Sequence, residues 1–144
     1  MEDSIGSVLA DVSRLMRRSF DERARSIGVT RAQWQVLTML RRHEGIRQGG
    51  LADLLDVEPI TLCRMVDRLQ EAELVERRRD PADRRIWRLY LRGKARDLLA
   101  ELQPLADAVM AEMLEGINQK ERNSLRLSLE KLRQNLSRRT VEEA

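Results

Sequence analysis

Cysteine, histidine and aromatic residues are scarce in this sequence, and each scarcity argues against a class of protein. Cys63 is the single cysteine, so it cannot form an internal disulfide, and we expect a reducing compartment. One cysteine and one histidine cannot supply a closed zinc shell. Two tryptophans, one tyrosine and one phenylalanine offer few platforms for stacked bases, which disfavours a protein that binds single-stranded nucleic acid.

Long apolar runs are also missing. We find no run long enough to cross a bilayer, and the acidic start Met1-Glu2-Asp3 is unlike a secretory signal. We therefore expect a cytoplasmic protein without a membrane partner. The sequence lacks a Gly-rich phosphate loop, and His43 has no evident nucleophile to activate. We expect no catalytic residues, no metal and no cofactor.

Charge, by contrast, is plentiful, since 35% of the residues are charged. Residues 77–96 contain nine basic and two acidic residues, a net charge of +7, whereas the rest of the chain has 18 basic and 22 acidic residues and a net charge of −4. A local excess of this kind fits a polyanionic partner such as duplex DNA. The alternative is a basic face that is only solvated.

The segment from Pro59 to Ala72 predicts an amphipathic helix that follows a shorter helix and a turn at residues 56–58. Its apolar residues recur at three- and four-residue spacing and form one stripe that can pack on a core. They are Leu62, Met65, Val66, Leu69 and Ala72. The opposite side carries Ile60, Arg64, Asp67 and Arg68. Such a helix suits the DNA major groove, where arginine can pair with guanine and an apolar side chain can meet the thymine methyl group.

Two short segments of strand composition, residues 74–77 and 86–91, follow this helix. The polar residues 78–85 between them include Pro81 and predict the tip of a β-hairpin. A basic hairpin beside a recognition helix can straddle the DNA backbone and enter the minor groove. Ile46 could add a short third strand.

The remaining segments predict helices. Residues 3–26 form one amphipathic helix that stops at Gly28. Thr30 and Gln33 form a capping-box pair for a helix ending near His43, and Asn118 and Glu121 form a second pair for the last helix. Pro104 should kink or split the helix over residues 93–116.

Taken together, these segments resemble the winged helix-turn-helix of the MarR family of bacterial regulators, in particular its SlyA type. The matching stretches are residues 51–55, 59–69, 74–75 and 80–85. The resemblance implies a mostly α fold with a small β-hairpin wing and a helical dimerisation lobe. Residues 1–144 would be a single MarR-type domain, with the winged helix-turn-helix DNA-binding lobe in residues 30–92 and dimerisation helices in residues 1–28 and 93–140.

The function implied is that of a homodimeric, sequence-specific transcriptional regulator of double-stranded DNA. Repression is the common outcome in the family, although SlyA-type proteins also relieve silencing and activate. The terminal helices are more apolar than a lone winged domain requires, so we expect a twofold partner to cover them; folding back on the same chain is the alternative. A twofold dimer would bind a pseudo-palindromic operator with half-sites ~34 Å apart. A helical interaction scaffold remains a further alternative.

The resemblance also assigns residues to DNA contact. They are Ile60, Thr61, Arg64, Arg68, Arg84 and Arg85. Arg64 would contact base edges, or only a phosphate, and Thr61 a phosphate. Ile60 would meet a thymine methyl group or simply be exposed. One of the wing arginines Arg84 and Arg85 would enter the minor groove while a carboxylate holds the other, and Asp67 and Asp83 are the candidate holders.

Trp34 is most simply a core residue. In SlyA-type proteins, however, a tryptophan here lies beside a pocket for small aromatic carboxylates such as salicylate, and Arg14 and Arg17 also match that type. Thr38 and Met65 depart from the SlyA pattern, so the identity of a ligand stays open. Oxidation sensing by Cys63 is an alternative to the simpler interpretation of an inert thiol.

Overall fold

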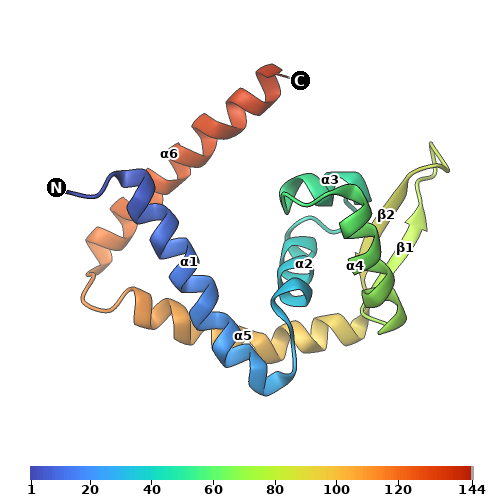
Figure 1. Cartoon of the computed structure of the whole chain (residues 1–144), viewed down its shortest axis with the longest axis horizontal. Coiled ribbons are helices and arrows are strands. Elements are labelled where there is room, and N and C mark those ends of the chain that lie inside the picture. The colour runs from blue at the N-terminus through green and yellow to red at the C-terminus, as the bar shows by residue number, and fades with distance from the viewer. Residues whose placement is uncertain (144) are drawn as a thin grey trace. The chain divides into compact units, whose positions relative to one another are not determined.

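A computed structural model of the chain describes residues 1–143, with side chains described through residue 138 (Figure 1). Within residues 1–143 there are six α-helices, one 3₁₀ turn and a two-stranded hairpin, which confirms the predicted mostly α fold with a β-hairpin. The elements are α1 (Ile5–Ala24), η1 (Arg25–Ile27), α2 (Arg31–Arg42), α3 (Gln48–Leu54), α4 (Pro59–Glu71), β1 (Val75–Arg79), β2 (Trp87–Leu91), α5 (Gly93–Met113) and α6 (Gln119–Glu143).

The chain divides into two compact units, residues 1–109 and residues 110–144. The first unit contains the buried core, to which every element from α1 to α5 contributes apolar side chains. The largest fully buried side chains are Val36, Leu37, Leu40, Leu51, Leu62, Val66, Leu69, Val75 and Leu89. Removing these side chains from water is the main force that holds α2, α3, α4 and the hairpin together.

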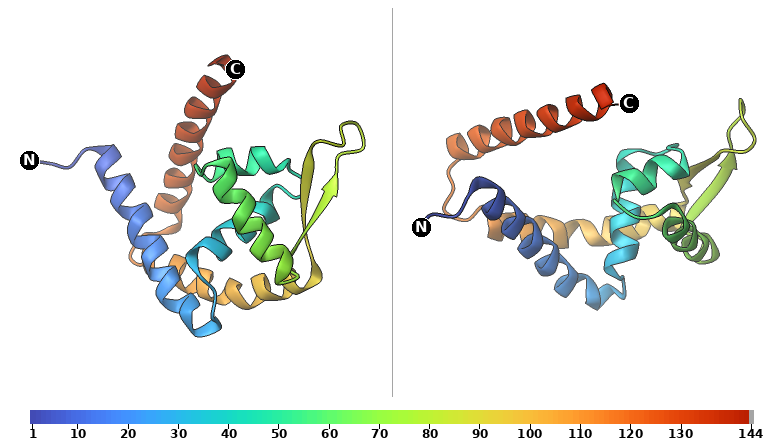
Figure 2. Two further views of the ribbon diagram at one scale, coloured as in Figure 1. Left: turned by 45° about the vertical axis from the view of Figure 1, so that its right-hand side comes forward. Right: turned by 45° about the horizontal axis from the view of Figure 1, so that its top comes forward.

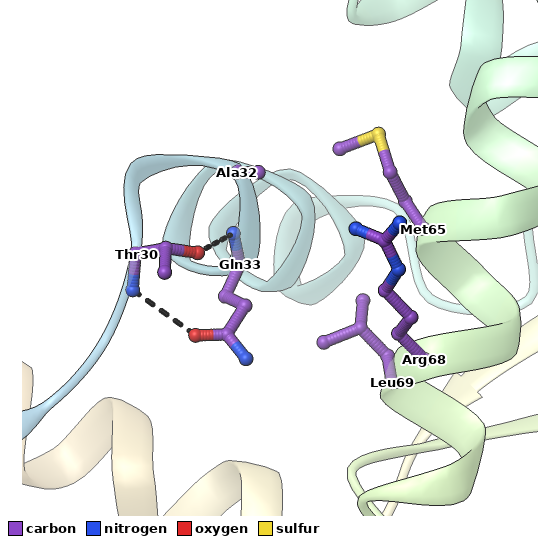
Figure 3. Close-up of a pocket in the computed structure, with 6 residues that line it drawn as sticks. All are labelled: Thr30, Ala32, Gln33, Met65, Arg68 and Leu69. Carbon is purple, nitrogen blue, oxygen red and sulfur yellow. Dashed lines mark hydrogen bonds between the residues drawn. The ribbon is translucent and has the colours of Figure 1, made fainter.

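Two local sequence signals of the first unit act where we predicted, at the end of the α1–η1 segment and at the start of α2. Gly28 ends the α1–η1 segment with φ 79°, a conformation that glycine adopts easily. Thr30 and Gln33 form the predicted capping box at the start of α2, with hydrogen bonds of 3.2 and 3.0 Å between side chain and backbone (Figure 3). The last three residues before Gly28 form a 3₁₀ turn rather than α-helix.

A tight turn joins α3 to α4. Asp56 has φ 52°, and the Val57 N–H donates to the Ala52 carbonyl at 3.1 Å, which draws the chain back over the end of α3. Pro59 then occupies the first turn of α4, where its missing N–H leaves no carbonyl unpaired. The predicted turn at residues 56–58 is confirmed.

The hairpin pairs β1 with β2 in antiparallel register, from Val75 opposite Leu91 to Arg79 opposite Trp87. Both views in Figure 2 show its tip extending away from α2, α3 and α4. Ile46 does not add a third strand to the hairpin, because a single bridge between Arg47 and Arg88 forms instead. Next to this bridge, the Gly45 N–H donates to the Leu89 carbonyl at 2.8 Å and the Leu89 N–H donates to the Ile46 carbonyl at 3.0 Å.

Of the two predicted effects of Pro104, a kink or a split, the split does not occur, because helix α5 continues through this residue. Proline removes one backbone hydrogen bond from the helix. Leu99 and Leu102 before it and Val109 after it are all buried, and their packing keeps both halves of the helix in place.

The second unit contains the end of α5 and all of α6. Asn118 and Glu121 bond reciprocally, with the Glu121 N–H donating to the Asn118 side chain at 2.9 Å, which confirms the second capping box. Helix α6 begins directly after the capping residue Asn118 and continues to Glu143. In the described part of the chain no helix has the length and apolar character needed to cross a bilayer.

Candidate nucleic-acid interface

Helix α4 has one buried and one exposed face, as its sequence predicted. Leu62, Val66 and Leu69 are buried, and Met65 and Ala72 pack beside them. The first two turns present Ile60, Thr61 and Arg64 to solvent. Ile60 is 60% exposed, which is unusual for an isoleucine and leaves it available to a partner.

Arg64 and Arg68 are both exposed, and neither makes a side-chain hydrogen bond or ion pair within the described residues. Arg68 extends from α4 toward the first turn of α2, beside a hollow of about 160 Å³ (Figure 3). The hollow is lined by Thr30, Ala32, Gln33, Met65, Arg68 and Leu69.

Asp80 organises the wing tip. It is only 4% exposed, and its Oδ1 accepts from the backbone N–H groups of Ala82 and Asp83 at 2.8 and 3.1 Å. Its Oδ2 accepts from Arg88 Nε at 2.7 Å, and Arg88 donates in turn to the Gly45 carbonyl at 2.8 Å. The Ala82 amide, then Arg88 and the Asp83 amide, lower the pKa of Asp80 below its ordinary value. Sequence reasoning assigned Asp80 no role.

The two wing arginines are held differently. Arg85 makes a bidentate pair with Asp83, with both nitrogen–oxygen distances 3.1 Å, and this hydrogen bonding lowers the pKa of Asp83. The Arg84 side chain is exposed and has no such partner in the part of the chain that the structure describes. The Arg84 carbonyl accepts from Arg79 Nη1 at 2.7 Å, which fixes its backbone.

Asp67 does not hold a wing-tip arginine, and this expectation is corrected by the structure. Its carboxylate lies 2.6 Å from Arg77 Nη1, in the middle of strand β1. Arg77 lies nearer to α4 than the wing tip does. Its guanidinium, and not that of Arg84 or Arg85, therefore pairs with the Asp67 carboxylate. Sequence reasoning missed Arg77, although the alternation of a strand places it on the same face as the buried Val75.

Two further arginines lie over aromatic rings of the hairpin. The Arg79 guanidinium carbon is 3.7 Å from the centre of the Trp87 ring, and that of Arg78 is 4.1 Å from the centre of the Tyr90 ring. Arg78 also pairs with Glu76 at 3.2 Å. These cation–π contacts stiffen the hairpin and occupy two of its aromatic faces.

The three residues expected at a ligand pocket each have local partners. Trp34 Nε1 donates to Asp21 at 2.8 Å, and the Trp34 ring packs edge-on against Phe20 at 4.6 Å. Burial raises the pKa of Asp21, but hydrogen bonds from Arg31 and Trp34 outweigh it and leave the pKa lowered. Arg17 donates to Ser13 at 2.9 Å, and Arg14 lies 3.6 Å from Asp11. These contacts do not join the three residues to one another.

Cys63 is half-buried with its Sγ 3.7 Å from Arg77 Nη2. Among the described residues no cluster of three or more His, Cys, Asp and Glu side chains could hold a metal ion.

The contacts above leave a candidate interface that is built from the exposed face of α4 and the tip of the hairpin.

A helix–turn–helix followed by a basic antiparallel hairpin defines a winged helix-turn-helix protein. The model of the MarR family matches residues 29–87. The solved structure of transcriptional regulator PA3341 is 34% identical in sequence to this chain. The match covers 94% of this chain and 99% of the PA3341 chain, with a TM-score of 0.82. A MarR regulator from Methanosarcina mazei Go1 is 25% identical over 93% of this chain and 96% of its own, with a TM-score of 0.82.

A third structure is that of a mutant of MarR from E. coli complexed with operator DNA. It is 26% identical over 89% of this chain and 92% of its own, with a TM-score of 0.74. This chain belongs to the MarR family of transcriptional regulators. The relatives named here are regulators rather than enzymes.

Proposed function

We propose that this protein is a homodimeric regulator that binds double-stranded DNA at a pseudo-palindromic operator and acts as a repressor. The observation that carries the proposal is that some arginines of this region are paired with carboxylates and others are not. Arg77, Arg85 and Arg88 have carboxylate partners, whereas Arg64 on α4 and Arg84 at the wing tip are exposed and have none in the described residues. The similarity to an E. coli MarR complexed with operator DNA supports the same conclusion.

Helix α4 would enter the major groove with its N-terminal half. Arg64 can donate to guanine O6 and N7, and Ile60 can contact a thymine methyl group. Thr61 would donate to a phosphate. Arg68 faces the start of α2. It would contact the sugar–phosphate backbone of the DNA rather than a base.

The wing would reach the adjacent minor groove through Arg84. Arg85 would contact phosphate from its fixed position, because its guanidinium is already oriented by Asp83. The narrow minor groove has a strong negative potential that attracts an inserted arginine. Asp83 therefore acts by holding Arg85, and Asp80 by holding the loop that carries both arginines.

Exposed apolar residues on the terminal helices support the dimer. Helix α1 exposes one stripe, made of Ile5, Val8, Leu9, Val12 and Leu15. Helix α6 exposes another, made of Leu125, Leu129, Leu132 and Leu136. Exposed apolar stripes of this kind commonly mark a protein–protein interface, so residues 1–28 and 93–140 would supply the dimerisation helices and residues 30–92 the DNA-binding lobe.

A small aromatic carboxylate would bind near Arg14, Arg17 and Trp34, as the SlyA-type resemblance implies, and would act if it favoured a spacing of the two α4 helices that does not fit DNA. Titrating salicylate tests this part alone; unchanged tryptophan fluorescence and DNA affinity would count against it. A SlyA-type activator that needs no ligand is the alternative. The proposed role places the protein with chromosomal DNA, in the cytoplasm.

The test is selection of bound fragments from the source genome, followed by a titration of the best fragment at several salt concentrations. We expect a pseudo-palindromic fragment bound at least about 10³-fold more tightly than random duplex, with affinity falling steeply as salt rises. Equal affinity for all sequences, or no binding, would contradict the proposal.

A further inference from the structure

We infer that Arg77 is a positioning residue: it fastens the wing to the recognition helix, so that Arg84 and Arg64 are presented to DNA at a set separation. This inference rests on the proposed function and adds a residue that would act without touching DNA. It follows from the partners of Arg77, which come from α3 and α4.

Arg77 is the most fully engaged of the hairpin arginines described. Its side chain is only 10% exposed. Nε donates to Gln48 Oε1 at 2.9 Å, Nη1 donates to Gln70 Oε1 at 2.8 Å, and Nη2 donates to the Cys63 carbonyl at 3.0 Å. Together with the Asp67 carboxylate at 2.6 Å, these contacts use every nitrogen of the guanidinium.

The partners span both helices of the helix–turn–helix. Gln48 begins α3, while Cys63, Asp67 and Gln70 lie one and two turns apart on α4. A planar guanidinium that bonds several fixed groups holds its strand in one orientation, which a flexible lysine ammonium does not. The guanidinium therefore determines where β1 lies relative to α4.

The position of Arg77 makes it unsuited to direct DNA contact. Its donors are already occupied by protein oxygens, and breaking these bonds would leave polar groups unpaired. Arg78, its neighbour on β1, pairs with Glu76 and Tyr90 inside the hairpin. Arg77 thus joins the hairpin to α4, whereas Arg78 does not. Arg78 is therefore a matched control for Arg77.

A double-mutant cycle on the full-length protein and its selected operator tests the inference. In Arg77→Lys, which keeps the charge, the wing should lose its fixed position, so the contribution of Arg84 to binding should become smaller. We expect Arg84→Ala to weaken binding about tenfold in the wild-type background and less than about threefold in Arg77→Lys, while Arg64→Ala costs the same in both. Arg78→Lys should leave all these values unchanged.

Additive losses from Arg77→Lys and Arg84→Ala would overturn the inference, as would unaltered binding by Arg77→Lys. A residue that merely supported the whole fold would lower the melting temperature without changing the cycle after correction for folded protein. Asp67→Asn provides a milder variant, because it removes one partner and leaves Arg77 in place. It should show the same non-additivity with Arg84→Ala, to a smaller extent.

A readout without DNA separates this inference from the proposed function. Trp87 borders the same hollow as Arg77, together with Gln48, Cys63, Asp67 and Gln70. In a Trp34→Phe background Trp87 is the single tryptophan, so its emission reports how the hairpin lies on α4. Arg77→Lys should shift that emission to the red and increase quenching by acrylamide, whereas Arg78→Lys should not. Unchanged Trp87 emission would overturn the inference even if DNA binds as proposed.

Discussion

At the scale of single residues, what distinguishes the basic side chains of this protein is how each is held. Arg85 and Arg88 are paired with Asp83 and Asp80, so each guanidinium is held in one orientation. Arg64 and Arg84 lie exposed without such pairs in the described chain. A guanidinium without protein partners can bind DNA without first giving up hydrogen bonds, which makes it the more favourable contact.

Asp21 offers a prediction at the same scale. Asp21→Ala removes the acceptor for Trp34 Nε1 and for Arg31, and a half-buried indole N–H is left without its partner. We expect a loss of about 1 kcal/mol or more in the free energy of unfolding, measured by urea denaturation.

Asp11→Ala is the matched control, since Asp11 pairs with Arg14 at 3.6 Å on the exposed side of the same helix. It should change the stability by less than about 0.5 kcal/mol. Equal effects of the two substitutions would show that the Trp34 hydrogen bond is not what Asp21 contributes.

At the scale of elements, the wing tip depends on Asp80. The pKa of this carboxyl is lowered in the folded protein, chiefly by the Ala82 amide and Arg88, so the folded state prefers it ionised. Its contribution is therefore fully present above the unfolded pKa of about 3.9 and is lost as the pH falls through the lower folded pKa. The tip should remain ordered at pH 5 and loosen only in strong acid.

Asp80→Asn tests this dependence. Asparagine can still accept from the Ala82 and Asp83 amides, but it cannot form the ion pair with Arg88. An acid titration followed by the amide resonance of Ala82, which donates to Asp80, should show a large transition below about pH 3.9 in the wild type and only the smaller change caused by Asp83 in the variant. The same transition in both proteins would mean that another group controls the tip.

Much of this arrangement of elements could be predicted from the sequence, because the relevant signals are local. The stripe of Leu62, Val66 and Leu69 identifies the buried face of α4, and the pair of Thr30 and Gln33 marks the start of α2. Strand alternation places Arg77 on the face of the buried Val75, but it does not show which helix carboxylate lies there, so the pair of Arg77 with Asp67 could not be predicted. The intact helix at Pro104 also depended on packing that no local pattern shows.

At the scale of the whole molecule, the exposed apolar stripes of α1 and α6 are the features that a single chain leaves uncovered. In α6 the residues Leu125, Leu129, Leu132 and Leu136 fall on one side at helical spacing, whereas Leu127 falls on the opposite side. If a second copy covers the stripe, substitutions on the two sides should have opposite outcomes.

Leu129→Glu should convert the dimer to a folded monomer, because a charge would be buried at the interface. Leu127→Glu, at a residue that is 60% exposed against 40% for Leu129, should leave the dimer intact. Sedimentation equilibrium of both variants measures the outcome. Identical behaviour, whether both dimeric or both monomeric, would argue against this face as the interface.

Base recognition is assigned here to Arg64 on α4 and sequence-independent contact to Arg84 on the wing. The most direct test measures the DNA affinity of Arg64→Ala and of Arg84→Ala for a set of operators that differ at single base pairs. Arg64→Ala should lose about 1 to 3 kcal/mol on the preferred operator and discriminate less at one base pair in each half-site. Arg84→Ala should weaken binding to all the operators by a similar factor. An equal loss on every sequence for both variants would contradict the account.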